Sequence, residues 1–433
     1  MYNPFNKNIS EIEYSDLKKL KDNDVSEGWF IEYKESFPKN NKKIANSIAS
    51  FANSEGGWYI VGIKESDNES KPSEIIGFDL DSYKKPTDKI TNIVKDNIDP
   101  IPYFESKVIE IPEEKVVLVV QVFEGHDTPY ISNGSIYIRV GETSKPLPID
   151  DRYQFEKLLD KKDTFQKKVD SFMENTFFFD KSYNQPYLEF YVYINNPKNI
   201  LFDDFYSEEF FETLKNKFKS KTKIIEELDI SAAFDFDNIH SSVDSYILRH
   251  VYNNSPLHTG LILELFKEGH LKLILPFNIY TNTTLNNKYN SLIYYDYFIS
   301  DELADLRIID LAESMFAFQI ILSKYKQLLK EYNCEYGLNI KYKFNNFNSI
   351  TPFIDSKEYI KFIYENKLPI NLKTTVNIPN KGYLIIPFED FNVMNFSLNM
   401  IEAMGLPRHL IEIISEGYAK FISIKSKNDK NED

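Results

Sequence analysis

The chain has 433 residues and a formal net charge of −15, from 51 basic and 66 acidic residues. This acidic balance argues against a protein that grips nucleic acid through bulk positive charge, although a local basic stripe around an acidic site stays compatible with it. The single cysteine, Cys334, excludes an internal disulfide and a cysteine-based zinc site. A hydrophobic share of 42% is typical of a globular protein.

The first third of the chain predicts alternating helices and strands. Apolar residues recur at helical spacing over residues 14–21, 42–51, 84–96 and 149–168. Strands are expected over residues 28–34, 58–63, 108–111, 116–123 and 135–141, which are rich in β-branched and aromatic residues.

The pattern changes after residue 185. Strands are expected over 188–194, 261–266, 271–275 and 383–388, and helices over 208–219, 310–332, 358–364, 394–404 and 407–424. The sequence therefore predicts an α+β protein. It has an N-terminal domain (1–165) with a mixed sheet and flanking helices, a linker helix or boundary (166–184), a separate α+β C-terminal domain (185–424) and a charged, disordered tail (425–433).

No membrane or export signal is visible. The first residues lack the apolar core of a secretory signal, and no segment reaches the roughly 18 uninterrupted apolar residues of a membrane span. We therefore expect a cytoplasmic protein without a membrane partner.

Three glutamates and a lysine gather around two predicted strands. Glu32 and Lys34 are two apart in the first strand and so share one face, and Glu65 follows the end of the second strand. If these strands pair, their carboxylates meet at one edge. Strand parity turns Glu27 the other way, so it joins them only if the chain bends near Gly28.

Clustered carboxylates repel one another, and a divalent cation is the usual reason for such a cluster. Mg²⁺ or Mn²⁺ takes hard oxygen ligands and can activate water for attack on a phosphodiester, while Lys34 could stabilise charge on a phosphate oxygen. From spacing alone, the alternative is a set of solvated charges on an exposed strand.

Several motifs in this stretch agree in order and spacing with one family. They are Glu27, Glu32-Tyr33-Lys34, Ser50-Phe51-Ala52-Asn53-Ser54-Glu55-Gly56-Gly57, Gly62-Ile63-Lys64-Glu65, Pro129-Tyr130, Tyr137-Ile138-Arg139-Val140-Gly141 and Thr143. Together they resemble the Schlafen-type AlbA-like domain over roughly residues 10–165. The family pattern is a glutamate, four residues, Glu-aromatic-Lys, a helix ending in Ala-Phe-Ala-Asn-Thr-x-Gly-Gly, an apolar strand and Gly-Val-Asp-Asp.

The resemblance implies a metal-dependent endoribonuclease that cleaves structured RNA such as tRNA. Its catalytic residues would be Glu27, Glu32, Glu65 and Lys34, with the three carboxylates holding Mg²⁺ or Mn²⁺. The sequence departs from the family where Glu65 replaces an aspartate and Lys64 replaces the aspartate before it, which affects the expected activity more than the fold. Two alternatives stay open: a non-catalytic nucleic-acid-binding transcriptional regulator, and an acidic protein-interaction module.

Local basic residues are the candidates for nucleic-acid binding. Lys39, Lys42 and Lys43 lie just before and at the start of the helix over 42–51 and could hold backbone phosphates, with a solvated lysine face as the alternative. Arg139 matches a strand arginine of the family, and its planar guanidinium suits a phosphate.

The remaining expectations concern assembly and regulation. One acidic lobe offers few phosphate contacts, so we expect a homo-oligomer, with an interface on the apolar stripes of helices 310–332 and 394–424 unless these stripes form core. An unrelated C-terminal half next to a toxic nuclease fits anti-phage defence, in which that half senses a phage-derived trigger.

Overall fold

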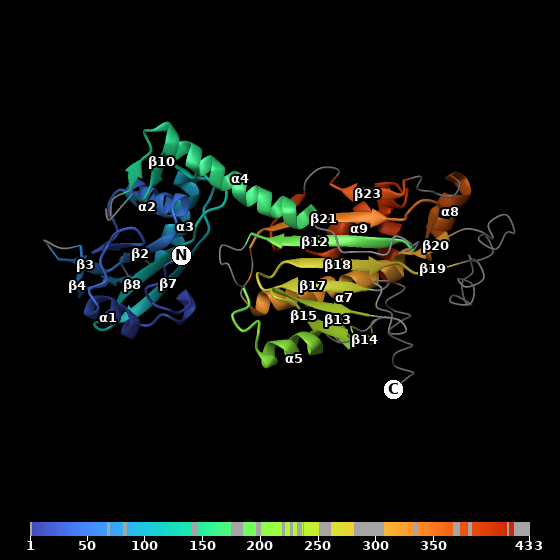
Figure 1. Cartoon of the computed structure of the whole chain (residues 1–433), viewed down its shortest axis with the longest axis horizontal. Helices are drawn as coiled ribbons and strands as arrows, with labels where there is room; N and C mark the ends of the chain where they lie inside the picture. The colour runs from blue at the N-terminus through green and yellow to red at the C-terminus, as the bar shows by residue number, and fades with distance from the viewer. Residues whose placement is uncertain are drawn as a thin grey trace. The chain divides into compact units, whose positions relative to one another are not determined.

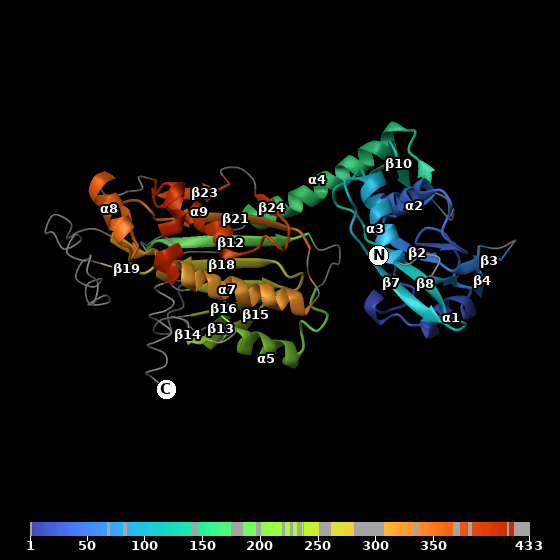
Figure 2. The same cartoon turned by 180° about the vertical axis from the view of Figure 1, so that it is seen from behind.

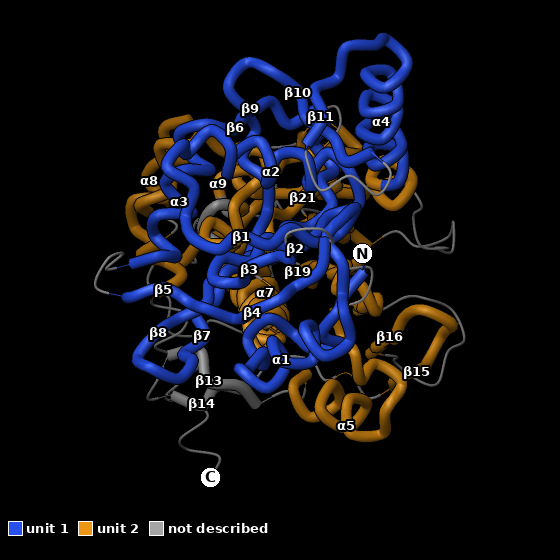
Figure 3. The backbone as a smooth tube through the Cα atoms, turned by 90° about the vertical axis from the view of Figure 1, so that its left-hand side faces the viewer, with its two compact units in different colours: residues 1–168 blue, residues 169–433 orange. Residues whose placement is uncertain are grey.

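A computed structural model describes most of the chain. The described residues are 2–66, 70–80, 85–140, 146–174, 185–195, 201–218, 221–225, 228–231, 236, 238–250, 261–280, 307–332, 334, 336–366, 373–379, 383–413 and 415–419. Residues 175–184 of the predicted boundary and the predicted disordered tail, 425–433, lie outside them. The chain divides into two compact units, residues 1–168 and 169–433 (Figure 3). Both are α+β, which confirms the predicted fold class.

The first unit is built on a mixed sheet (Figure 1). Strand β1 (Ile31–Lys34) pairs in parallel with β2 (Gly57–Val61), and β2 pairs antiparallel with β8 (Lys115–Val122). On its other side β8 pairs with β7 (Phe104–Ile111). The first residues of β8 also pair with β5 (Phe78–Asp79). The sequence analysis predicted that Glu32 and Glu65 meet only if their two strands pair. The pairing of β1 with β2 fulfils that condition.

Helices cover both faces of this sheet. Val116, Leu118, Val120 and Val122 belong to one core with residues of α2 (Asn41–Asn53) and α3 (Pro86–Asn97). Val117 and Val119 belong to a second core with residues of α1 (Tyr14–Asp22) and of the 3₁₀ turn η1 (Ile9–Glu11). Burial on both faces explains why β8 reads as a continuous apolar run and not as an alternating one.

The predicted strand over 58–63 is two strands. Gly62 adopts a φ of 111°, a conformation that favours glycine, and its N–H donates to the carbonyl of Lys34 at 2.7 Å. The chain then continues as β3 (Ile63–Glu65), which pairs with β4 (Pro72–Ile75). This break separates Glu65 from the end of β2 and sets its position beside β1.

The rest of the first unit is a small sheet and a long helix. The sheet runs in the order β11 (Leu147–Pro148), β10 (Ser135–Ile138), β9 (Ile131–Ser132) and β6 (Ile98–Asp99). Asn53, the last residue of α2, ties this sheet to the helix: its side chain donates to the carbonyls of Tyr130 and Tyr137 and accepts from the Tyr130 N–H. Helix α4 (Arg152–Glu174) runs six residues beyond its predicted end at residue 168 and crosses the division between the units.

The second unit holds an eight-stranded sheet in its described part (Figure 2). Its order is β15 (Asn238–Ser241), β16 (Ser245–Arg249), β17 (Ile262–Phe266), β18 (Leu271–Pro276), β12 (Tyr187–Ile194), β21 (Leu338–Asn345) and β23 (Thr375–Ile378), with β24 (Leu384–Ile386) also on β21. Strands β17 and β18 form the predicted hairpin.

Further strands and helices of this unit lie outside the eight-stranded sheet. The strands are β13 (Lys221–Ile225), β14 (Leu228–Ser231), β19 (Ile279–Tyr280), β20 (Arg307–Asp310) and β22 (Ile350–Phe353). The helices are α5 (Glu208–Lys217), α7 (Leu311–Glu331), α8 (Lys357–Asn366), α9 (Val393–Ala403) and the 3₁₀ turn η6 (Arg408–Leu410).

The apolar stripes that the sequence offered as an oligomer interface are core. On α7, Met315, Phe318 and Ile321 are at most 1% exposed, and on α9, Met400 and Ile401 are at most 2% exposed. All five belong to the single large core of the second unit. The interface predicted on the stripes of α7 and α9 is therefore wrong, because these stripes cover their own sheet. Residues 414 and 420–424 of the second predicted stripe lie outside the described residues. Among the described helices, none is long and apolar enough to cross a bilayer.

A carboxylate cluster around Lys34

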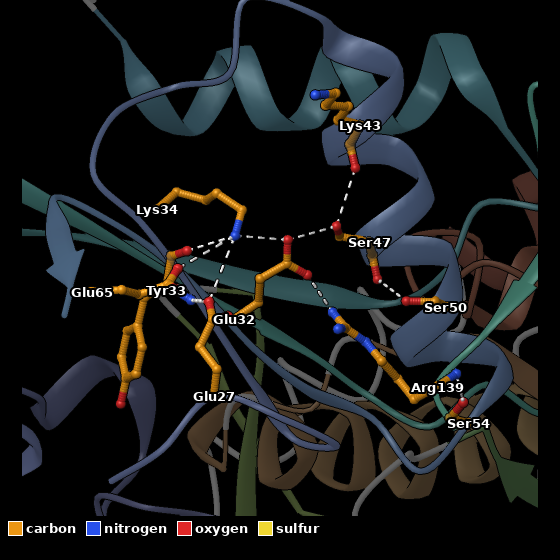
Figure 4. A network of polar contacts seen from close by, with 10 residues as sticks. All are labelled: Glu27, Glu32, Tyr33, Lys34, Lys43, Ser47, Ser50, Ser54, Glu65 and Arg139. Carbon is orange, nitrogen blue, oxygen red and sulfur yellow. Dashed lines mark hydrogen bonds and ion pairs between the residues drawn. The ribbon is translucent and has the colours of Figure 1, made fainter. Parts of the chain in front are cut away.

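Lys34 lies at the centre of the predicted site (Figure 4). Its Nζ is 3.1 Å from Glu32 Oε1, 3.6 Å from Glu27 Oε1 and 4.0 Å from Glu65 Oε1. It also donates to the carbonyl of Tyr33 at 2.6 Å. The structure thus brings together all four residues that the sequence assigned to catalysis, around an ammonium group.

Glu27 reaches the cluster because the chain bends. The Gly28 N–H donates to the carbonyl of Ile31 at 3.0 Å, which folds the segment back before β1 begins. The Glu27 carboxylate accepts a hydrogen bond from the Tyr33 N–H, and the Glu27 N–H donates to the carbonyl of Ser70 at 2.6 Å. Strand parity alone would have placed Glu27 on the other face, so this turn supplies the third carboxylate.

Arg139 holds Glu32 from within the protein. Its side chain is 0% exposed, its guanidinium pairs with Glu32 Oε2, and it stacks on the Phe51 ring with 3.9 Å between Cζ and the ring centroid. Ser47 of α2 donates to the other oxygen, Glu32 Oε1, at 3.0 Å. The predicted contact of Arg139 with phosphate is therefore wrong: this guanidinium is buried and positions a carboxylate.

Burial and the neighbouring opposite charges shift the pKa values of this cluster in opposite directions. Burial raises the pKa of the Glu27 carboxyl to about 7, with the Glu65 charge adding to the rise and the Lys34 charge opposing it. Burial lowers the pKa of Lys34, but the attraction of Glu32, Glu27 and Glu65 outweighs it and the pKa is raised. Lys34 is therefore charged at neutral pH, whereas Glu27 exchanges its proton near neutral pH.

The predicted basic residues lie at the start of α2. Lys39, Lys42 and Lys43 are exposed, and the helix begins at the N-cap Asn40, whose side chain accepts from the Lys42 N–H at 3.0 Å. Lys43 is one turn before Ser47, the residue that donates to Glu32. Lys42 and Lys43 thus lie in the first turn of the helix that also contacts the cluster, and Lys39 lies just before its N-cap, a favourable arrangement for phosphate.

The donor set suits a divalent ion by chemistry, but Lys34 takes the central place. Three carboxylates supply the oxygen ligands that Mg²⁺ and Mn²⁺ prefer. Yet each has an oxygen turned to Nζ of Lys34, and Glu32 is also held by Arg139 and Ser47. Within the described ranges, no three His, Cys, Asp or Glu side chains are grouped so as to hold a metal ion. A metal ion bound by these same three oxygens would take the place of the Lys34 ammonium.

Two contributors escaped the sequence analysis. Ser47 is a small polar residue on the buried face of an amphipathic helix, between Ile44 and Phe51, and that position was a usable signal. The pairing of Arg139 with Glu32 joins residues 107 apart in the chain, and no local pattern indicates it.

Comparison with known proteins gives the family of this region. Residues 27–148 match the family Schlafen, AlbA_2, so the first unit contains a Schlafen AlbA-like domain, and this is a nucleic-acid-binding family. No curated protein matches the chain.

Two solved structures are similar over about the same share of the chain. The DIP2311 protein from Corynebacterium diphtheriae is 24% identical over 30% of this chain and 26% of its own, with a TM-score of 0.22. The N-terminal domain of a RecG-related protein from Nitrosomonas europaea is 20% identical over 31% of this chain and 94% of its own, also with a TM-score of 0.22. The chain thus covers about a quarter of the length of the Corynebacterium protein.

Proposed function

We propose, from the Schlafen AlbA_2 domain at residues 27–148, that this protein binds structured RNA such as tRNA and cleaves its phosphodiester backbone. The observation that carries the proposal is the convergence of Glu27, Glu32 and Glu65 on Lys34, because four charged groups rarely share one place without a chemical use.

Each residue of the cluster has a role that its exposure allows. Lys34 and Glu65 are 30% and 36% exposed and can meet a substrate, with Lys34 stabilising negative charge on a phosphate oxygen. Glu32 is 5% exposed and is fixed by Arg139, which acts as a positioning residue. Lys39, Lys42 and Lys43 hold the RNA backbone beside α2.

Mg²⁺ or Mn²⁺ is the proposed cofactor, with Glu27, Glu32 and Glu65 as its ligands. When bound, such an ion supplies an activated water for attack on phosphorus. Lys34 releases the carboxylates on metal binding and turns to the phosphate, so one lysine serves both states.

The test is cleavage of total tRNA by the full-length protein, with Mn²⁺ or with EDTA. Glu65→Gln is the informative variant, because Glu65 is the most exposed of the three carboxylates and its loss leaves the buried pair of Glu32 and Arg139 intact. We expect cleavage to fall at least a hundredfold in the variant and to disappear in EDTA. Calorimetric Mn²⁺ binding should weaken in parallel. Glu110→Gln, an exposed change on β7, is the matched control. Full cleavage by Glu65→Gln, or cleavage in EDTA, would contradict the proposal.

A second candidate is a nucleic-acid-binding regulator without catalysis. The place that Lys34 takes among the carboxylates favours it, since the ammonium already neutralises part of the cluster. RNA or DNA binding that is unchanged by Mn²⁺, with no cleavage, would select this reading.

Assembly and cellular role are further parts of the proposal. A homo-oligomer would multiply the phosphate contacts of one acidic lobe, and light scattering of the full-length protein tests it. Anti-phage defence, with a phage-derived trigger sensed by the second unit, would follow from a regulated RNase and is tested by phage challenge of cells that carry the wild type or Glu65→Gln.

A further inference from the structure

A concave site lies within the first unit, beside the carboxylate cluster. It is a cavity of about 470 Å³, within the range of roughly 300–1,000 Å³ typical of small-molecule sites. Its walls are one side of α4, the end of α2 and the residues that follow β10. Of the site described above, only Arg139 borders it, so the cavity is not part of the carboxylate cluster.

One stripe of α4 forms a wall of this cavity. Tyr153, Lys157 and Lys161 are spaced four residues apart and therefore lie on one helix face, with Gln154 and Leu158 beside them. Tyr153 is 75% exposed, an unusual position for a large aromatic ring, and Lys157 is exposed as well. This stripe presents a flat ring and an ammonium group to the same space.

Hydrogen bonds connect the residues at the floor of the cavity. Ser54 Oγ accepts a hydrogen bond from the Arg139 N–H at 2.9 Å, and Lys161 donates to the Ser54 carbonyl at 2.6 Å (Figure 4 shows Arg139 between Glu32 and Ser54). Lys161 also pairs with Glu124 at 2.9 Å. The floor is thus preorganised, and through Arg139 it is linked to Glu32.

Trp29 supplies a hydrogen-bond donor at the cavity. It is half-buried, and its indole N–H is shielded from solvent. Among the residues that the structure describes, none accepts from this N–H. A buried donor without an acceptor is costly, so a ligand with an acceptor atom would gain by filling the cavity.

We propose that this cavity binds an unstacked nucleotide. The base stacks on the Tyr153 ring and offers a ring nitrogen or carbonyl to the Trp29 N–H, and its phosphate meets Lys157. The nucleotide is either an unpaired residue of a bound RNA or a free nucleotide, because both carry the same base and phosphate. The RNA source rests on the proposed function, whereas the free nucleotide does not.

The chain carries a reporter for this binding. It has two tryptophans, Trp29 and Trp58, and Trp58 is 0% exposed. Tryptophan fluorescence of the full-length protein should therefore fall when a base stacks near Trp29. The titrants are the four nucleoside monophosphates, a single-stranded RNA hexamer, and a blunt RNA duplex as the control without unpaired bases.

The variants separate this cavity from the cluster. Tyr153→Ala and Lys157→Ala should each raise the apparent Kd, obtained from the fluorescence quench, at least tenfold. Lys162→Ala removes a neighbouring lysine that pairs with Asp127 and does not border the cavity, so it should bind as the wild type does. Glu65→Gln should also retain the quench, which distinguishes failure of cleavage from failure of nucleotide binding.

The titrants also identify the source of the ligand. Quenching by monophosphates assigns the cavity to a free nucleotide, and quenching by the hexamer alone assigns it to RNA. No quench with any single-stranded titrant, an equal response to the duplex, or an equal loss in Lys162→Ala would overturn the proposal.

Discussion

Arg139→Met is the most direct test of how the cluster is held together. The change removes the guanidinium that pairs with Glu32 and keeps an apolar side chain against Phe51. Glu32, which is 5% exposed, then keeps Lys34 at 3.1 Å and Ser47 at 3.0 Å as its partners among the described residues. The buried Glu32 carboxylate thus loses the buried guanidinium that pairs with it.

The magnitude follows from that loss. Removing one member of a buried ion pair costs about 3–5 kcal/mol, and the partners that remain place this case at the lower end, about 3 kcal/mol. With a urea m-value of about 2 kcal/mol/M, the midpoint should fall by about 1.5 M. Because both tryptophans belong to the first unit, their fluorescence follows the unfolding of that unit.

Two further variants make this result interpretable. Arg152→Met breaks an exposed pair with Glu156, in which the arginine is 89% exposed, and should cost at most about 1 kcal/mol. The double variant Glu32→Gln/Arg139→Met should cost less than the sum of its single changes by about 1–3 kcal/mol, since the charges are lost together. The buried pair does not hold the site if Arg139→Met costs no more stability than Arg152→Met. The same conclusion follows if the stability losses of Glu32→Gln and Arg139→Met are additive in the double variant.

The other predictions use the same unit. Burial raises the pKa of Glu27 to about 7 from its usual 4.5, so the folded unit loses stability as pH rises from about 4.5 to 7 and this carboxyl ionises. Glu27→Gln should therefore stabilise the unit by up to about 3 kcal/mol at pH 8 and have little effect at pH 4. An equal effect of the variant at both pH values would contradict this. Changing Lys39, Lys42 and Lys43 to glutamine should reduce the salt slope of RNA binding by about 2–3, whereas Lys18→Gln/Lys21→Gln on α1 should leave the slope unchanged. A Cβ at Gly57 would lie 2.2 Å from the Phe51 ring and 2.8 Å from the Phe30 carbonyl oxygen, so Gly57→Ala should destabilise the unit by about 1–3 kcal/mol in urea unfolding, and a wild-type midpoint would show that both neighbours can move aside.

The sequence by itself determined the main helices and strands of the first unit and the four charged residues of the cluster. Apolar spacing placed α2, whose predicted span of 42–51 lies within Asn41–Asn53, and the apolar run at 116–123 placed β8. Both signals are local, because each residue's burial is dictated by the period of its own element. The order of Glu27, Glu32-Tyr33-Lys34 and Glu65 was likewise enough to nominate the cluster and the family of the domain.

What only the tertiary structure decided is the use of each charge. Arg139 carries the same guanidinium whether it lies on a surface or in a core, and its 0% exposure results from β10 meeting the end of α2 through Asn53 and Ser54. The stripes of α7 and α9 read equally well as interface or core, and the sheet that they cover settled the matter. Burial and pairing depend on contacts between distant segments, and the period of one element holds no information about which segment will cover it.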